Sequence, residues 1–304
     1  MTQSQNKGMA LMTVSALLWS ISGALIKLIP WSPFVIAGWR SLLAALVFVC
    51  YFVWRGYRLV LTRRTLLSGL VLTLTMFLYI TACKLTTSAN AIILQSTAPV
   101  FIMLLGTLFL GHHYRRQEYL MVVVVLGGIG LFFLDQLTPG SLLGNLLALV
   151  SGVTFGATFL LSNTLPDDQS AQSALLLGHL MTALVGVPLT LVFDTPVTLP
   201  SVAAMGVLGI VQLGIPYVLY GLAVRMATPL TCSLIGMLEP LLNPLWVLLA
   251  VGERPGFWSL IGGAVVLGTV CAWMLMNAAL ATAQQRAAQE SAADNSMSQE
   301  QETM

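Results

Sequence analysis

The chain has 304 residues, of which 57% are hydrophobic and 8% are charged, and its formal net charge is +2. Soluble globular domains carry about 25% charged residues. This composition therefore excludes a soluble catalytic domain or a basic nucleic-acid-binding face, and it indicates a membrane protein.

Ten apolar segments follow one another along the chain. A bilayer core of about 30 Å requires about 20 apolar helical residues to cross it, and we predict spans at 9–28, 32–54, 65–83, 88–110, 118–135, 142–162, 171–193, 201–223, 228–250 and 256–278. The predicted fold is an all-α integral membrane protein with ten transmembrane helices. Residues 1–8 are expected to form a cytoplasmic N-terminus, and residues 279–304 a disordered cytoplasmic tail rich in Gln, Ala, Ser and Glu.

Two basic residues lie deep within predicted spans in an otherwise apolar context. Arg40 is about nine residues into the second span, and His179 lies in the seventh. A charge at the bilayer centre costs from about 2.5 to more than 10 kcal/mol, so such residues usually face a cavity or a partner. Arg40 is expected to bind a substrate carboxylate, to pair with Glu239 or with backbone carbonyls, or to extend its guanidinium to a membrane boundary. His179 is expected either to relay protons or to be a packing residue.

The fourth and ninth segments contain prolines within the span. Pro99 follows Gln95 by one turn in the fourth segment, and the ninth contains Pro240 and Pro244. Each proline removes a backbone donor and frees a carbonyl one turn earlier. Such carbonyls are tolerated at membrane depth only where protein, a polar side chain or cavity water satisfies them. We therefore predict that these two helices are broken or kinked, and that they line a polar pathway or act as hinges.

Glu239 lies about eleven residues into the ninth segment, directly before Pro240 and one turn before Asn243. One interpretation is that it lines a central cavity and binds a substrate ammonium group or couples transport to protons. The other is that it is a structural carboxylate, hydrogen-bonded between helices or protonated and buried. The sequence leaves both open, and it places Glu239 and Asn243 among the expected pathway residues.

Basic residues are distributed unequally between the two predicted faces. With the N-terminus inside, nine Lys or Arg residues lie at cytoplasmic ends and three at outside ends; the nine are Lys7, Arg55, Arg58, Arg63, Arg64, Arg115, Arg116, Arg225 and Arg286, and the three are Lys27, Lys84 and Arg254. Basic residues favour the cytoplasmic side. We therefore predict a multi-pass protein of the bacterial inner membrane with both termini in the cytoplasm.

The two halves of the chain resemble each other. "GMALMTVSALLWSISG" from Gly8 aligns with "GNLLALVSGVTFGATF" from Gly144 at an offset of 136, and an offset of 141 later superposes Pro99 on Pro240. The domains predicted are a first repeat at 9–135 and a second at 142–278. Because each repeat has five helices, the second enters the membrane inverted, as in many secondary transporters.

Repeat equivalence also selects further candidate residues. Small residues spaced by four lie at equivalent places in the first and sixth segments, where they permit close helix contact; the pairs are Ala16/Ser20 and Gly152/Gly156. Aromatic residues that superpose between the halves are expected to line an aromatic cavity or to be lipid-facing or core residues; they are Trp19, Phe155, Tyr79 and Tyr220.

Three stretches resemble a known family. They are "LLWSISGALIK" (Leu17 to Lys27), "GWRSLLAAL" (Gly38 to Leu46) and "YGLAVRMATPLTCSLIGMLEPLLNPLWVLLAVGE" (Tyr220 to Glu253). Together they are similar to the EamA-type domain of the drug/metabolite transporter superfamily, over about 9–278. The resemblance implies a ten-helix carrier of small metabolites such as amino acids or sugars. The first repeat departs from it, with Ala98 where the second has Glu239 and Gly111-His112 where the second has Gly252-Glu253.

We therefore expect a secondary active transporter that moves a small metabolite, an amino acid or related compound, by alternating access, with export favoured by the resemblance alone. An intramembrane enzyme and a non-transporting membrane sensor or scaffold are the alternatives. No catalytic residues, cofactor or metal site are predicted, since His112, His113 and His179 form no metal-binding motif and no phosphate-binding loop occurs. The expected partners are a small-molecule substrate and membrane lipid, with no nucleic acid, and the chain is expected to be a monomer or a weak dimer.

Overall fold

The computed structural model describes residues 3–110, 116–132, 134, 139–226, 235–236, 238–273, 275–276 and 279. Every regular element in these ranges is helical. The predicted tail beyond 279, and the predicted features at His112, His113 and Arg286, lie outside the described residues.

Seven helical stretches are long and apolar enough to cross a membrane; they are Gln5–Leu28, Pro33–Arg55, Arg63–Leu85, Ser88–Leu105, Gly140–Thr158, Asp168–Leu191 and Leu199–Tyr220. Three shorter apolar helices cover Tyr119–Leu131, Leu238–Val251 and Phe257–Trp273. The structure thus confirms an all-helical architecture within the described residues, with several helices long and apolar enough to cross a membrane. Each of the ten stretches overlaps one predicted segment, and a count of ten spans remains a prediction.

Several of the predicted segments are built from more than one helix. The first is α1 (Gln3–Ser20) and α2 (Ser22–Leu28), the fourth is α5 (Ser88–Gln95) and α6 (Ala98–Leu110), and the eighth is α10 (Leu199–Gly206), the π-helix η2 (Val207–Gly214) and α11 (Ile215–Met226). The remaining elements are α3 (Pro33–Arg55), α4 (Arg63–Leu85), α7 (Arg116–Phe132), α8 (Pro139–Asn163), α9 (Asp168–Gly186), the 3-10 helix η1 (Pro188–Leu191) and α13 (Leu238–Val251).

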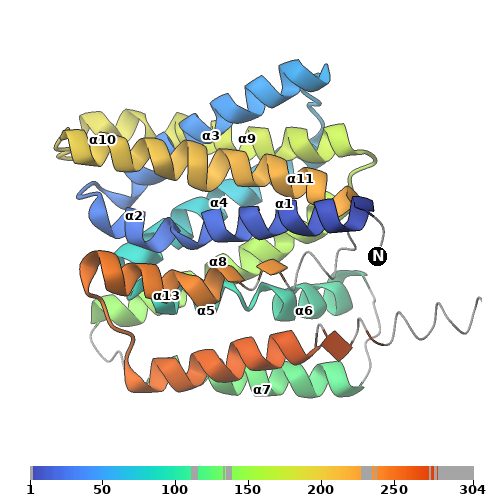
Figure 1. Cartoon of the computed structure of the whole chain (residues 1–304), viewed down its shortest axis with the longest axis vertical. Coiled ribbons are helices and arrows are strands. Elements are labelled where there is room, and N and C mark those ends of the chain that lie inside the picture. The colour runs from blue at the N-terminus through green and yellow to red at the C-terminus, as the bar shows by residue number, and fades with distance from the viewer. Residues whose placement is uncertain are drawn as a thin grey trace, which may run out of the picture.

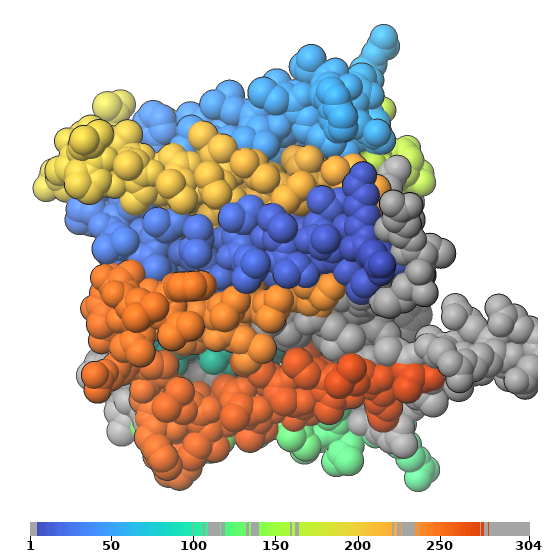
Figure 2. Space-filling model, viewed as in Figure 1, coloured from blue at the N-terminus to red at the C-terminus, as the bar shows by residue number. Residues whose placement is uncertain are grey.

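The helices lie roughly side by side in a bundle (Figure 1). Helix α4 packs on α8 and α9, and α3 packs on α9 and η2. Helix α1 lies between α11 and α13, which the space-filling view shows as adjacent rods (Figure 2). At one edge, α7 contacts the Phe257–Trp273 helix, where Gly128 approaches Val265 and Val266. Segments from the two halves of the sequence therefore interleave throughout the bundle.

Local sequence signals explain where helix α3 ends and where helix α4 begins. Helix α3 ends at Gly56, whose φ of +66° is a left-handed conformation that glycine adopts without steric cost. Helix α4 begins after Thr62, whose side chain accepts a hydrogen bond from the Thr65 amide while the Thr65 hydroxyl accepts one from the Thr62 amide. This capping box satisfies backbone donors that the first turn of a helix leaves unpaired.

Glycines allow α3 and α9 to touch backbone to backbone. A Cβ added to Gly186 would lie 2.5 Å from the Phe34 carbonyl oxygen and 2.6 Å from the Gly38 Cα, and one added to Gly38 would meet Gly186 in the same way. Such close approach is a common way for helices to associate in a membrane.

We expect Gly38→Ala to destabilise the protein by about 1–3 kcal/mol, because the added methyl group forces the two backbones apart. The measurement is thermal unfolding in detergent. The matched control is Gly206→Ala in α10, since a Cβ there meets nothing within 4 Å. Equal stability of the two variants would contradict the close contact.

Candidate functional site

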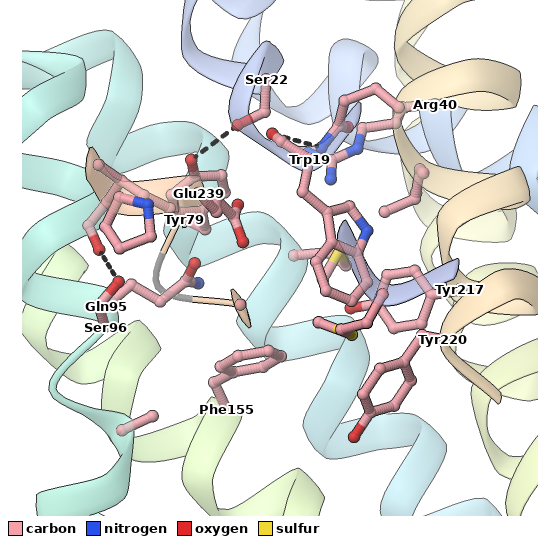
Figure 3. Close-up of a pocket in the computed structure, with 18 of the residues that line it drawn as sticks. Trp19, Ser22, Arg40, Tyr79, Gln95, Ser96, Phe155, Tyr217, Tyr220 and Glu239 are labelled. Carbon is pink, nitrogen blue, oxygen red and sulfur yellow. Dashed lines mark hydrogen bonds between the residues drawn. The ribbon is translucent and has the colours of Figure 1, made fainter. Parts of the chain in front are cut away.

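A cavity of about 270 Å³ lies inside the bundle and is lined by residues from both halves of the chain (Figure 3). Seven of the residues predicted to line a pathway or to break its helices lie on its wall; they are Trp19, Arg40, Tyr79, Gln95, Tyr220, Glu239 and Pro240. Phe155, the repeat equivalent of Trp19, also lines it. The structure therefore brings together residues that are up to 221 positions apart in the sequence.

Arg40 extends from α3 to the cavity wall with only 4% of its surface exposed. Its Nε and Nη1 atoms are buried and have no hydrogen-bond partner. A buried guanidinium without partners is costly, and charged donors at such a place favour an anionic ligand group. Arg40 is therefore a charged donor that an anionic group entering the cavity would meet.

Glu239 faces the same cavity from α13, on the side of Gln95 and Tyr79, whereas Arg40 lies on the side of Trp19 (Figure 3). No ion pair within 4.0 Å joins Glu239 to Arg40; the ion pair found among the described residues links Lys27 to Glu253. The alternative in which Arg40 pairs directly with Glu239 is thus wrong for this conformation. The two ionisable side chains instead lie on different sides of a shared cavity.

Glu239 lies near the start of α13, within the predicted ninth segment. Helix α13 begins at Leu238, so Glu239 and Pro240 lie in its first turn, and Ile235 and Gly236 just before it are also helical. A carboxylate there interacts favourably with the helix dipole, and proline is tolerated because the first-turn amide needs no intrahelical partner. Pro244 is the proline that lies inside α13. Residues 227–234 and 237 lie outside the described ranges.

Aromatic rings form much of the remaining wall. Trp19 contacts Tyr217 and Tyr220, with ring centroids 5.4 and 5.7 Å apart. The hydroxyl groups of Tyr79 and Ser22 share a hydrogen bond of 3.2 Å. Such walls provide a large apolar contact surface with a few polar groups, which is typical of small-molecule sites.

The cavity wall coincides with two helix breaks. The chain leaves the helix at Ile21 between α1 and α2, and at Ser96–Thr97 between α5 and α6. The second break lies just before Pro99, which is in the first turn of α6. A Cβ on Gly152 would lie 3.1 Å from the Leu94 carbonyl oxygen, so the predicted small-residue pair of α8 packs directly on this break.

Two of the residues predicted to lie on the pathway, Asn243 and His179, do not line the cavity. Asn243 is fully buried, and its Nδ2 donates to the Ser20 carbonyl at 3.0 Å and to the Ser22 hydroxyl at 3.3 Å. It therefore joins α13 to the α1–α2 break. His179 is also fully buried, with its Nδ1 3.4 Å from the Ser41 hydroxyl and its ring against Tyr217. His179 therefore lies behind the residues that line the cavity, in contact with Tyr217.

The sequence reasoning missed several lining residues, among them Ser22, Ser96, Gln212 and Tyr217. Gln212 is a polar residue within an apolar span, the same signal that selected Gln95. In the structure its Nε2 donates to the Trp19 carbonyl at 3.2 Å. Tyr217 lies three residues before Tyr220 and hence on the same helix face. Both signals were present in the sequence.

The chain matches the model of the EamA-like transporter family over residues 6–134 and 142–283. Two proteins of Archaeoglobus fulgidus, each described as an uncharacterized transporter, are similar to it. The first is 30% identical over 214 residues, covering 69% of this chain and 76% of the relative. The second is 27% identical over 279 residues, covering 86% and 94%.

A solved crystal structure of a protein has a similar fold. Its TM-score is 0.62 and its sequence identity 20%, with 90% of this chain and 98% of that chain covered. At this level of identity the likeness concerns the fold alone.

Proposed function

Since this chain belongs to the EamA-like transporter family, we propose that it is a secondary active transporter for a small zwitterionic metabolite, an amino acid or a related compound. In this proposal the substrate crosses the bacterial inner membrane by alternating access, with export as the working direction. The chain is a multi-pass membrane protein, and the family is one of transporters. An enzymatic or sensory role gains no support from the geometry of the cavity.

The observation that carries the proposal is the placement of an arginine and a glutamate on different sides of one cavity. Arg40 offers unpaired buried donors on one side, and Glu239 offers a carboxylate on the other. A ligand that carries both a carboxylate and an ammonium group satisfies both at once, by a charge-assisted pair with each. A singly charged ligand leaves one buried charge without a partner, which is strongly unfavourable.

The size and wall of the cavity restrict the substrate further. A volume of about 270 Å³ lies just below the range of about 300–1,000 Å³ of pockets for drug-sized ligands. The rings of Trp19, Phe155, Tyr217 and Tyr220 surround the part of the cavity away from Glu239 (Figure 3). We assign them to the side chain of the substrate, which favours an apolar or aromatic amino acid.

An inverted repeat of five helices per half, at 9–135 and 142–278, gives the proposal its mechanism. The repeat is supported by pairs of equivalent residues that line one cavity, Trp19 with Phe155 and Tyr79 with Tyr220. Two similar halves can exchange conformations, so that a site between them faces each side in turn. The ten-span topology with both termini in the cytoplasm belongs to the same proposal.

Either the substrate gradient or proton exchange at Glu239 supplies the driving force. We expect purified protein in liposomes to show saturable, gradient-dependent flux of a radiolabelled amino acid, screened over a panel of amino acids and sugars. Imposing a pH gradient separates the two driving forces. Folded protein that carries no zwitterionic compound would contradict the proposed function.

A further inference from the structure

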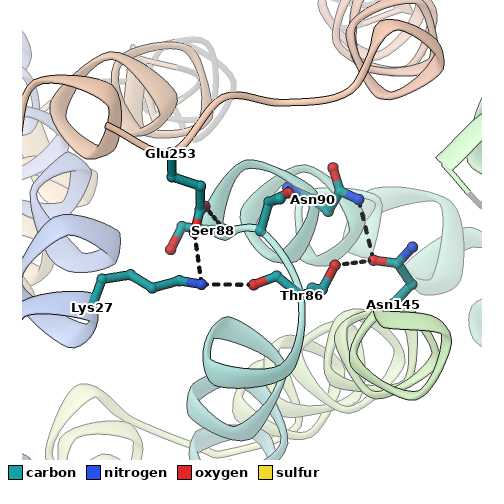
Figure 4. Close-up of polar contacts among 7 residues, drawn as sticks. Lys27, Thr86, Ser88, Asn90, Asn145 and Glu253 are labelled. Carbon is teal, nitrogen blue, oxygen red and sulfur yellow. Dashed lines mark hydrogen bonds and ion pairs between the residues drawn. The ribbon is translucent and has the colours of Figure 1, made fainter. Parts of the chain in front are cut away.

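A second polar cluster, distinct from the cavity, joins the two halves at one end of the bundle (Figure 4). The Lys27 Nζ lies 2.7 Å from the Glu253 Oε2 and donates to the Thr86 carbonyl at 2.9 Å. The Ser88 amide donates to the Glu253 Oε1 at 2.6 Å. Glu253 thus binds a side chain and a backbone amide of the first half simultaneously. We call these residues, with Asn90 and Asn145, the Lys27 cluster.

The second half contributes a further link beside Glu253. Asn145, near the start of α8, accepts through its Oδ1 from the Thr86 hydroxyl at 2.7 Å and from the Asn90 Nδ2 at 3.3 Å. Next to it, a Cβ on Gly144 would lie 2.7 Å from the Thr86 amide nitrogen. The first-half loop between α4 and α5 is therefore held from two sides by the second half.

The Lys27 cluster lies beyond one end of the cavity. Ser22 is the cavity residue nearest to Lys27 in the sequence, and five residues of helix correspond to about 7 Å along the axis. Between them the packing is tight, since a Cβ on Gly23 would lie 2.6 Å from the Asn243 Oδ1 and 2.9 Å from the Ser88 Cβ. In the second half of the chain, the cavity residue Pro240 precedes Glu253 by thirteen residues, so Glu253 also lies away from the cavity wall along the chain. The cluster and the Gly23 contact thus close the bundle at this end.

From this placement we propose that Lys27 and Glu253 form a gate, which holds this end of the pathway shut and must separate before the cavity opens there. The inference rests on the alternating access of the proposed function. The side chains of Lys27 and Glu253 are 19% and 20% exposed. A partly exposed pair is less stabilising than a fully buried one, because its ions can hydrate once they part. That property suits a contact that breaks in every transport cycle.

The test measures access to the cavity from the side of Lys27. In a background without its four cysteines, Ser96→Cys places a thiol on the cavity wall, and a membrane-impermeant methanethiosulfonate reagent is added from that side. We expect Glu253→Gln to accelerate labelling about 5-fold to 30-fold, the ratio that one or two kcal/mol produces. Glutamine still accepts from the Ser88 amide but lacks the charge that binds Lys27.

The side of the membrane is identified independently of the gate. Val197 is 75% exposed. Its neighbour Pro196 lies at the end of the bundle that carries Lys27, because the Pro196 carbonyl accepts a hydrogen bond of 2.9 Å from the indole of Trp31, and Trp31 follows Lys27 by four residues. Val197→Cys therefore reports the reagent's access to this end. The charge-reversed pair Lys27→Glu with Glu253→Lys should return labelling of the cavity thiol toward the parent rate.

Lys84→Met is the matched control. Lys84 lies at the same end, but it donates to the Ile29 carbonyl, within the first half, so its loss should not change labelling.

The gate is refuted if Glu253→Gln and Lys27→Met both fold and label at the parent rate. Labelling needs no substrate, so the result is separate from that of the flux assay. Normal flux with unchanged labelling would refute the gate alone, and changed labelling without flux would refute only the proposed function.

A cross-linking experiment tests the gate independently if the charge variants do not fold. Lys27→Cys with Glu253→Cys, joined by a bifunctional methanethiosulfonate linker, fixes this end shut. We expect the tether to abolish both labelling from this side and flux, and a reductant that cleaves the linker to restore them. Undiminished flux in the tethered protein would overturn the gate.

Discussion

Replacing Arg40 with methionine should lower transport of a zwitterionic substrate about 100-fold or more without lowering the melting temperature of the empty protein. Each hydrogen bond to a charged group contributes about 1.5–3 kcal/mol, and the guanidinium offers at least two unpaired donors to a carboxylate. In the empty protein the same group is a buried charge with two unsatisfied atoms, so a methionine of similar length relieves a cost. Flux in liposomes and thermal unfolding in detergent measure the two effects.

Arg64→Met is the control for the loss of an arginine. Arg64 is exposed and makes a long contact, 3.5 Å, to the Thr164 carbonyl, so both flux and stability should remain near the parent values. Arg40→Lys should retain part of the activity, because lysine keeps the charge but not the planar fork. A large fall in the melting temperature of Arg40→Met would contradict a binding role and make Arg40 structural.

Glu239→Gln is expected to lower flux about 10-fold to 100-fold, through loss of one charge-assisted pair with the substrate ammonium. The amide has the same shape, so folding and membrane insertion should be unchanged. If Glu239 also exchanges protons, the variant loses the stimulation of flux by a pH gradient. Flux is measured with and without that gradient, and the yield of monodisperse protein reports folding.

Asp168→Asn makes the same chemical change away from the cavity. Asp168 begins α9 and accepts from the Tyr57 hydroxyl at 2.8 Å, and its replacement should leave flux close to the parent level. An equal loss of folded protein and of flux in Glu239→Gln would show that the carboxylate supports the fold rather than the substrate.

The sequence predicts much of the cavity because the relevant signals are local. Arg40, Gln95 and Glu239 stand out as polar residues at membrane depth, and the repeat selects Trp19 and Tyr79 as partners of second-half aromatics. All five line the cavity. The apolar segments predict the helices for the same reason, since length and hydropathy are properties of a single stretch.

Features that depend on tertiary contacts could not be predicted in this way. The break at Ile21 has neither proline nor a loop sequence; it is held by Asn243 and by Trp246, whose indole donates to the Ser20 hydroxyl at 2.9 Å. The ion pair of Lys27 with Glu253 joins residues 226 positions apart. His179 has the polarity of a pathway residue, and only the packing against Ser41 and Tyr217 places it behind the wall.

The most direct test of the central claim, that one cavity recognises both charges of a zwitterion, is a set of equilibrium binding measurements with three ligands. The ligands are the amino acid with the largest flux, its amide without a carboxylate, and the matching acid without an ammonium group. We predict that the parent protein prefers the amino acid to both analogues. Arg40→Met should lose the preference over the amide, and Glu239→Gln the preference over the acid. Parent protein that binds all three ligands equally would contradict the claim.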